Sequence, residues 1–455
     1  MCPSRARIHW RKPTLSVSKI HVAKARLTIH FVTSAPYGWY IWSMACVGRY
    51  FLQRGWEEDV MKYDVAIIGG GLAGIVSALK LKEFGYSPLV IDASLPQAEG
   101  SIGGFVKFSG AKFSLPPAGL GLLDVAGSEK ELYTAISEVE TFFELDLSSS
   151  FESHDVNKEM DSLRKYQSVV LEKEEINTLV NHLDGMLKSK NIPVVQGECV
   201  EIKNDRELFD VKIRSDDGDV VESAKTIFFA GGRRNNSLIK SLGVKATKGK
   251  GIDVGVRVEF FSLEDLKKLR SLGPDAKIIK DRCRTFCLNS PGEVYYYDYN
   301  GVSIPGGVVA SCNVERANFG ILLRLDAKAE VLNRIVSYYH DIQPCLIENG
   351  VTVESGFLGR AEPLLKELYG KSSVSKLKDF ADFLMSKGLV DWSKPHIIHM
   401  PLIDWHWDTF SVKGSFKTSI SDVYCLGDVS GHARGLLQAA VSGVLASREF
   451  KNGRS

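Results

Sequence analysis

The sequence lacks paired cysteines, a strong net charge and a long uninterrupted apolar segment. Its eight cysteines are scattered, with no C-x-x-C pair and no zinc-ligand spacing, which fits free thiols in a reducing compartment. The formal net charge of +2 gives no reason to expect a nucleic-acid partner. With 44% hydrophobic and 25% charged residues the chain has a globular composition, and its 455 residues allow two or three domains.

Residues 1–60 differ in composition from the rest of the chain. They hold nine Lys or Arg against three Asp or Glu, together with four of the seven Trp, so the remaining residues are net acidic. The segment from Phe31 to Gly48 is uncharged, but Pro36 and Gly38 interrupt it, and a membrane-spanning helix needs roughly 20 apolar residues. A transit peptide and an N-terminal anchor stay open as alternatives, but no stable membrane anchor is expected.

The favoured interpretation is that translation starts at Met61, just before the first predicted strand. The codons for Trp56 to Met61 are largely fixed by the genetic code, and with GAG for Glu57 they contain GGGAGG, which looks like a prokaryotic ribosome-binding site. Residues 1–60 are then a non-native upstream extension, or a disordered leader, outside the fold. This interpretation predicts a cytoplasmic protein whose folded unit begins at residue 61.

A strand, a glycine turn and a helix are predicted over residues 64–79. An apolar strand-like run leads into three glycines with the G-x-G-x-x-G spacing, and apolar residues then recur at helical spacing. The first glycine permits the tight turn, the second lets the backbone approach a pyrophosphate, and the third lets the helix pack on the strand. The helix N-terminus offers free N–H groups and a partial positive charge to phosphates. An ordinary glycine turn in an α/β domain is the alternative. The predicted cofactor contacts here are Gly69, Gly71, Leu72, Ala73 and Gly74.

Further predicted cofactor contacts follow this turn along the chain. Asp92 ends a second predicted strand about 20 residues after the turn, where a carboxylate accepts hydrogen bonds from an adenosine ribose. Gly103 and Gly104 lie in a small-residue loop that passes close to the cofactor in such folds, although an ordinary surface loop is equally consistent. Gly231 ends a buried strand that suits a return to the same parallel sheet.

A second signature stands near the C-terminus. A short strand ends in Gly427 and Asp428, and a helix is expected to begin near Gly435 and Leu436. In flavin-binding folds such an aspartate accepts hydrogen bonds from ribityl or ribose hydroxyls, and the helix N-terminus faces the flavin edge where negative charge develops on reduction. A solvated loop aspartate is the alternative. Together with the glycine turn, this pattern predicts FAD as the tightly held cofactor.

Three stretches together resemble the FAD-dependent oxidoreductases of the glutathione-reductase-like superfamily, and the nearer resemblance is to a poorly characterised family of FAD-dependent dehydrogenases. The stretches are 69–74, Gly255–Glu259 with Cys283–Cys287, and Tyr424–Ala440. The resemblance covers about 61–455 and implies a cofactor more firmly than a reaction. Members of this family usually follow the Arg-Thr-Phe-Cys stretch with a second cysteine, which is missing from Leu288–Glu293.

The predicted fold class is α/β, with a Rossmann-like FAD-binding domain built from discontinuous segments. Residues 61–243 are its first part, with a helical excursion over 124–189, and residues 401–455 are its return. Residues 244–400 are predicted to form an inserted α+β substrate or cap domain, which includes a strand-like stretch over Gly251–Phe260.

The catalytic residues are not identified by any motif, and two candidates stand out. Arg434 precedes the last helix, where it is placed to stabilise an anionic reduced flavin or to clamp a carboxylate substrate; phosphate or backbone anchoring is the alternative. Cys287 is either a reactive thiol or a small buried hydrophobe. His396 and His399 flank two isoleucines without further metal ligands, so no metal site is predicted.

These features predict an FAD-dependent oxidoreductase that transfers a hydride between flavin N5 and a small organic substrate or NAD(P)H. Only one dinucleotide fingerprint is present, so NAD(P)H is expected at most as a transient reductant. One alternative is a flavin-dependent RNA-modifying enzyme, which the acidic balance after residue 60 disfavours. The other alternative is a flavin-holding electron-transfer protein. The expected partner is a small-molecule substrate and not nucleic acid.

Overall fold

The computed structural model describes most of the chain after residue 62, with gaps. The described ranges are 63–93, 102–119, 121–147, 163–205, 207–249, 251–274, 277–339 and 350–454. The predictions for residues 1–60, including a start at Met61, lie outside these ranges. Within them, no helix is both long and apolar enough to cross a membrane.

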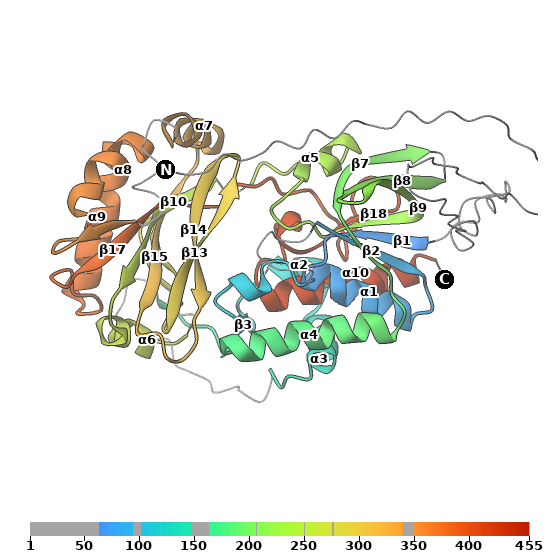
Figure 1. The fold of residues 1–455 in the computed structure, drawn as a ribbon, viewed down its shortest axis with the longest axis horizontal. Helices are drawn as coiled ribbons and strands as arrows, with labels where there is room; N and C mark the ends of the chain where they lie inside the picture. The colour runs from blue at the N-terminus through green and yellow to red at the C-terminus, as the bar shows by residue number, and fades with distance from the viewer. Residues whose placement is uncertain are drawn as a thin grey trace, which may run out of the picture. The chain divides into compact units, whose positions relative to one another are not determined.

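The first of two large sheets has a parallel centre (Figure 1). In order across the sheet its strands are β6 (Val194–Gln196), β2 (Pro88–Asp92), β1 (Tyr63–Ile68), β9 (Gly218–Phe229), β8 (Leu208–Ser215) and β7 (Glu198–Asp205). The C-terminal strand β18 (Val423–Cys425) also pairs with β9, in parallel. The pairs of β1 with β2 and β9, and of β2 with β6, are parallel, whereas β7, β8 and β9 form an antiparallel meander. The predicted α/β class with a Rossmann-like sheet is confirmed.

One layer of helices covers a face of this sheet (Figure 1). Its members are α1 (Leu72–Glu83), α3 (Glu129–Phe143), α4 (Lys173–Ser189) and α10 (Leu436–Asn452). Alternate residues of β1 point to opposite sides, so Val65 and Ile67 join the core with these helices while Ala66 and Ile68 join a second core. Helices α1 and α10 approach closely, because a Cβ at Gly443 would lie 2.5 Å from the carbonyl oxygen of Ala73.

The predicted helical excursion over 124–189 is only partly helical. Helix α2 (Gly121–Ala126) precedes α3, but β4 (Leu163–Arg164) and β5 (Ser168–Val170) come before α4. Strand β5 pairs with β3 (Lys112–Ser114), and β4 joins the edge of the second sheet. Because both strands find their partners far along the chain, local helical periodicity does not reveal them.

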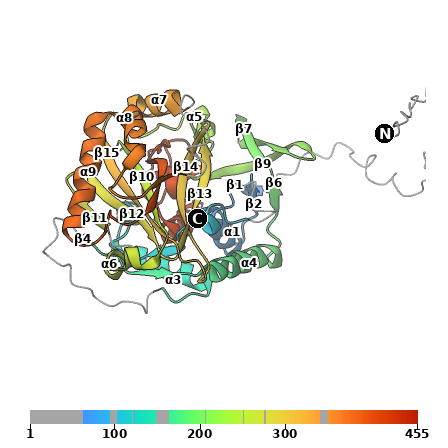
Figure 2. The same cartoon turned by 60° about the vertical axis from the view of Figure 1, so that its left-hand side comes forward.

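The second sheet is antiparallel and has helices on one side only (Figures 1 and 2). Its strands, in order, are β16 (Val351–Val353), β17 (His396–Asp404), β10 (Ile252–Phe260), β15 (Ala317–Leu325), β12 (Cys283–Asn289), β11 (Lys277–Lys280) and β4. The outer side carries α7 (Lys328–Tyr339), α8 (Glu362–Tyr369) and α9 (Lys371–Ser386). The hairpin β13 (Gly292–Tyr299) and β14 (Val302–Val309) lies on the side toward the first sheet.

Strand β10 shows how the two sides of this sheet differ. All nine of its residues are buried. Val254 and Val258 belong to the apolar core shared with α8 and α9. Asp253 and Arg257 alternate with them and therefore point to the opposite side. That side meets the hairpin, because a Cβ at Gly307 of β14 would lie 2.3 Å from Nη1 of Arg257. The second sheet thus carries a buried layer of polar side chains toward the first sheet.

Candidate functional site

The glycine turn between β1 and α1 has the geometry that its spacing predicts. Gly69 has φ +113°, and a Cβ there would lie 2.5 Å from the carbonyl oxygen of Ala230. A Cβ at Gly74 would lie 1.9 Å from the carbonyl oxygen of Gly69, so glycine is required for α1 to pack against the turn. At Gly71, no described heavy atom outside its own turn of chain lies within 4 Å of a Cβ position. The turn is therefore packed at its first and third glycines and open at its second.

Asp92 borders the turn at the end of β2. Its Oδ1 accepts a hydrogen bond from the backbone N–H of Gly70 at 3.1 Å. Burial raises the pKa of Asp92, and hydrogen bonds from the backbone N–H groups of Gly70 and Ala93 oppose this shift. A carboxylate accepts more hydrogen bonds than these two, so Asp92 keeps acceptor capacity beside the turn.

The other glycines predicted near the cofactor also border the turn. The N–H of Gly103 donates to the carbonyl oxygen of Gly70 at 2.7 Å, and Gly103 forms a parallel bridge with Gly71. A Cβ at Gly104 would lie 3.3 Å from Cα of Gly71. A Cβ at Gly69 would lie 3.0 Å from the backbone N of Gly231. All three predicted residues thus lie against the glycine turn, while their contact with a cofactor stays a prediction.

The C-terminal signature lies next to the first turn of α1. Gly427 has φ +66°, and a Cβ there would lie 3.4 Å from Cβ of Ala73. After a short loop, α10 begins at Leu436, as the sequence predicts, with Gly435 at its N-cap. Residues that are far apart in the sequence, near 71 and near 435, therefore start two helices that pack against each other.

Both helices begin without a side-chain cap. Neither Gly71 at α1 nor Gly435 at α10 offers a side-chain hydrogen bond, and neither first turn contains an acidic residue. Helix α3 differs, because its N-cap Ser128 accepts a hydrogen bond from the backbone, and α4 has a capping box formed by Glu172 and Glu175. We call the starts of α1 and α10 the bare N-termini. Each presents N–H donors and a partial positive charge.

Asp428 has a side-chain partner that sequence reasoning missed. Its Oδ2 accepts a hydrogen bond from Nε of Arg233 at 3.0 Å. The Arg233 guanidinium lies over the ring of Trp407 at 4.5 Å, and its Nη1 lies 3.4 Å from the hydroxyl oxygen of Tyr297. Arg233 follows the glycines at the end of β9, so it joins Asp428 to the polar layer of the second sheet.

A chain of alternating charges crosses that layer. Nη2 of Arg434 lies 2.6 Å from Oδ2 of Asp404, which also accepts from Nη2 of Arg284 at 3.0 Å. Arg284 donates in addition to Asp253 at 2.7 Å, and Arg324 donates to the same carboxylate. We call these five residues the charge ladder. Burial opposes ionisation of Asp404, but the positive charges of Arg434, Arg284 and Arg233 outweigh it and hold its pKa well below the usual range.

The structure gives the candidate Arg434 a partner that the sequence did not indicate. Besides its ion pair with Asp404, its guanidinium lies 4.9 Å from the ring of Trp405 and 5.5 Å from that of Phe286. Its positive charge is therefore already partly balanced by a carboxylate of the second sheet. A contact with a flavin or with a substrate carboxylate stays a prediction.

His406, between two tryptophans, was also missed. It is 2% exposed, and among the described residues neither of its ring nitrogens has a hydrogen-bond partner. Burial, aided by the nearby charge of Arg233, lowers the pKa of His406 to about 3. Its ring lies 4.0 Å from that of Tyr299. A single buried histidine in an irregular segment carries no sequence signal, so only the packing identifies this neutral imidazole beside the Asp428 and Arg233 pair.

The remaining residues singled out in the sequence are Cys287, His396 and His399. Cys287 lies where the pairing of β12 with β15 shifts register, and it is partly exposed. The two ring nitrogens of His396 lie within hydrogen-bond distance of the carbonyl oxygens of Lys394 and Phe357. His399 lies between the hydroxyl of Tyr296 and the carboxylate of Glu259. No group of potential metal ligands occurs among the described residues.

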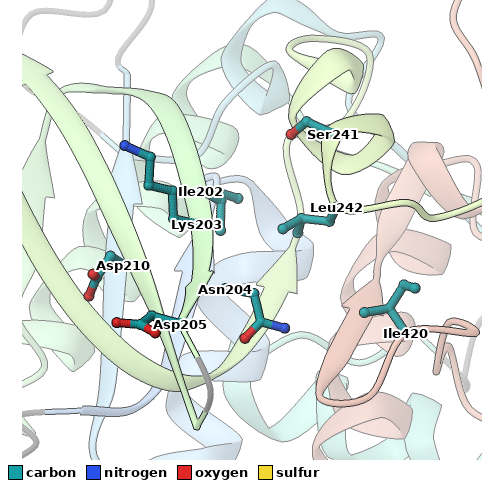
Figure 3. A pocket seen from close by; sticks show the side chains of 8 residues that line it. All are labelled: Ile202, Lys203, Asn204, Asp205, Asp210, Ser241, Leu242 and Ile420. Atoms are coloured by element: carbon teal, nitrogen blue, oxygen red, sulfur yellow. The ribbon is translucent and has the colours of Figure 1, made fainter.

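A surface pocket lies apart from these groups (Figure 3). Residues of β7 and β8 form it together with the end of helix α5 (Asn236–Ser241) and Ile420. Its charged residues are Lys203, Asp205 and Asp210. It contains none of the glycine-turn or charge-ladder residues, so we assign no function to it.

No protein-family model and no curated protein sequence matches this chain. Among solved structures it is similar to a geranylgeranyl bacteriochlorophyll reductase-like protein from Thermoplasma acidophilum, with 14% identity and a TM-score of 0.45 over 87% of this chain and 79% of that one. A flavoprotein/dehydrogenase from Cytophaga hutchinsonii has 13% identity and a TM-score of 0.42 over 86% and 79% of the two chains. A p-nitrophenol 4-monooxygenase from Pseudomonas putida has 13% identity and a TM-score of 0.38 over the same shares. These values are too low to support a conclusion about function.

Proposed function

We propose that this chain is an FAD-dependent oxidoreductase. The observation that carries the proposal is the pair of bare N-termini of α1 and α10, two packed helices in which the first turn of α1 lies against Gly443, two turns after the start of α10. Helix N-termini bind anions through free N–H groups and the helix dipole. FAD has a pyrophosphate in its middle and a ring that becomes negatively charged on reduction, so it has two anionic parts for two helix ends.

The other residues of the turn fit the same cofactor. The open space at Gly71 leaves room for a pyrophosphate close to the backbone. Asp92 has acceptor capacity for ribose hydroxyls, and Asp428 is an acceptor for the ribityl side of the molecule. The small residues Gly103 and Gly104 border this space without filling it. We assign the pyrophosphate to α1 and the flavin side to α10.

When bound, FAD supplies a ring that accepts or donates a hydride. The residues of the chain then have the tasks of binding and orienting a substrate and excluding water. Trp405 and Trp407 stack at 5.3 Å and supply apolar surface beside Arg233. His406 is buried and stays neutral above about pH 3, so it adds no charge beside Arg233 and Asp428. We propose a small organic molecule as substrate, with NADH or NADPH as a transient reductant.

The first experiment identifies the cofactor. We expect the purified protein to have the absorbance spectrum of an oxidised flavin and to release FAD when it is denatured. Addition of NADH, NADPH or candidate organic substrates without oxygen tests which of them bleaches that spectrum. A colourless protein that binds NAD stoichiometrically contradicts the proposal, and a flavin that no small reductant bleaches favours an electron-transfer role.

Gly71→Val tests the site at its open glycine. The valine side chain would occupy the space at the turn, so we expect loss of bound FAD with little change in folding, because no described atom lies near the new Cβ. Gly185→Val is the matched control, since Gly185 also has open space but lies in α4 away from the turn. Equal FAD content in both variants would refute the assignment of the pyrophosphate to α1.

A further inference from the structure

Arg257 is a buried cation whose hydrogen bonds are incomplete. Its side chain is fully buried on the polar side of β10. Nη1 donates to the carbonyl oxygen of Cys287 at 3.2 Å and to Oδ1 of Asn318 at 2.6 Å. Among the described residues, Nε and Nη2 have no partner. Both acceptors of Nη1 are neutral, so this buried guanidinium lacks the anion that a buried charge normally requires.

The nearest carboxylate on the same strand is already occupied. Glu259 lies 3.2 Å from Nε2 of His399 and 3.4 Å from Nη1 of Arg316. No ion pair joins it to Arg257 within the described ranges. Burial lowers the pKa of Arg257, and the negative charge of Glu259 only partly opposes this shift. The missing counter-ion must therefore come from another group.

The side chain of Cys287 is in the position to supply it. Nη1 of Arg257 donates to the backbone carbonyl oxygen of Cys287 at 3.2 Å, and the interaction with this side chain favours the charged form of Arg257. Nδ2 of Asn289 lies 3.7 Å from Sγ and Oδ1 lies 4.0 Å from it, so the amide can donate to a thiolate or accept from a thiol. A second cation is close, because Nζ of Lys112 donates to the carbonyl oxygen of Leu288. Cations of β10 and β3 thus donate to the backbone carbonyl oxygens of Cys287 and its neighbour Leu288, and Glu259, bound to His399, is the opposing negative charge.

The backbone also sets Cys287 apart from an ordinary strand residue. It has φ +43°, a conformation that non-glycine residues seldom adopt, at the register shift in β12. Strained residues of this kind concentrate at functional sites. A Cβ at Gly110 would lie 3.4 Å from Sγ, so the loop that continues from Gly104 contacts this thiol. Cys287 is therefore a partly exposed group at the junction of the two sheets.

Cys283 shows the contrasting environment on the same strand. It lies four residues earlier, is 3% exposed, and belongs to the apolar core with the outer helices. Burial raises the pKa of Cys283 to about 12. It has no arginine partner among the described residues, so the two cysteines of one strand differ in accessibility and in charge environment.

We propose that Cys287 is a nucleophilic thiolate paired with Arg257, and that it takes electrophiles carrying a negatively charged group. The chemistry is a substitution at carbon. With iodoacetate, the sulfur lone pair attacks the CH2 carbon, a C–S bond forms, the C–I bond breaks and iodide leaves, with no change in the number of protons on the attacking thiolate. The positive charge of Arg257 favours both the thiolate and the approach of the anionic reagent. The proposal does not rest on the bound cofactor.

The test measures alkylation of individual cysteines in the full-length protein by peptide mass spectrometry. Cys312 is free and exposed, and serves as the internal reference. We expect half-maximal alkylation of Cys287 by iodoacetamide at least about one pH unit below that of Cys312, as for thiols beside arginine. Iodoacetate is negatively charged and iodoacetamide is neutral. We therefore expect the alkylation rate with iodoacetate, divided by the rate with iodoacetamide, to be higher at Cys287 than at Cys312.

Two variants of Arg257 distinguish the effect of its positive charge on Cys287 from the effect of its packing. Arg257→Met should raise the half-maximal pH of Cys287 to that of Cys312 and abolish its preference for iodoacetate, whereas Arg257→Lys should keep most of both effects. A Cys287 that reacts no more readily than Cys312 in the unmodified protein overturns the proposal without any variant. Unchanged alkylation in a folded Arg257→Met protein, checked by circular dichroism, overturns the role of the arginine.

Discussion

Strands β1 and β10 lie at the centres of their sheets, and both are almost completely buried, but they bring different polar groups to the junction. The residues of β1 after Asp64 are apolar on both faces, and the polar groups follow the strand as backbone N–H groups of the glycine turn. Strand β10 places Asp253, Arg257 and Glu259 inside the protein itself. One sheet thus presents main-chain donors at helix ends, whereas the other presents charged side chains.

Because of this difference, the glycine turn and the charge ladder should respond differently to substitutions. A backbone donor needs only the correct turn, so its function depends on whether a side chain blocks it. A buried charge needs a partner of opposite sign, and loss of one partner leaves the other uncompensated. The glycine turn is therefore sensitive to added atoms, and the charge ladder is sensitive to removed charges.

The largest effect is expected when the charge ladder is broken. Asp404→Asn leaves Arg434 and Arg284 without their shared carboxylate, which should lower the free energy of unfolding by about 3–5 kcal/mol in urea denaturation. Asp326→Asn is the matched control, because its ion pair with Arg282 is largely exposed and should contribute nothing measurable. Similar stability of the two variants would mean that the ladder is not a stabilising network.

A smaller effect is expected at the packed glycine of the turn. Gly74→Ala places a Cβ 1.9 Å from the carbonyl oxygen of Gly69, so α1 has to shift. Overpacking of this kind costs about 1–3 kcal/mol, measurable by urea denaturation. Gly71→Val should keep its stability and lose FAD. If Gly74→Ala is as stable as the unmodified protein, the close packing of α1 on the turn is wrong.

The buried His406 should make stability depend on pH. Its pKa is lowered from 6.5 to about 3 in the folded protein, so between these values the unfolded chain binds a proton and the folded chain does not. Stability is therefore lost as pH falls through this window, by up to about 1.4 kcal/mol per pH unit. His406→Gln should remove this slope, measured by urea denaturation from pH 7 to 4. Parallel profiles for the two proteins would contradict it.

The smallest effect concerns a capped helix. Ser128→Ala removes the side chain that accepts from the N–H of Glu131, and should cost about 1 kcal/mol of stability. FAD content should not change, because this cap belongs to α3 and not to a bare N-terminus. Thermal unfolding and the flavin absorbance of the same sample check both expectations. Loss of flavin in this variant would contradict the assignment of the cofactor to α1 and α10.

The sequence alone determined the glycine turn, Asp92 and the start of α10 after Gly435. These features depend on spacing within a few turns of chain or on one strand–helix–strand unit, and glycine conformations are local properties. The short strands β4 and β5 were not predictable in the same way, since their partners lie far away in sequence.

Only the tertiary structure decided the polar layer. The alternation of valine with charged residues in β10 predicts a strand with one polar face, which is ordinarily a solvent-facing one. Burial of that face follows from the hairpin that covers it and from partners such as Asp404, which lies 120 residues from Arg284. The strength of a charge interaction depends on distance and on exclusion of water, and neither is a property of the local sequence.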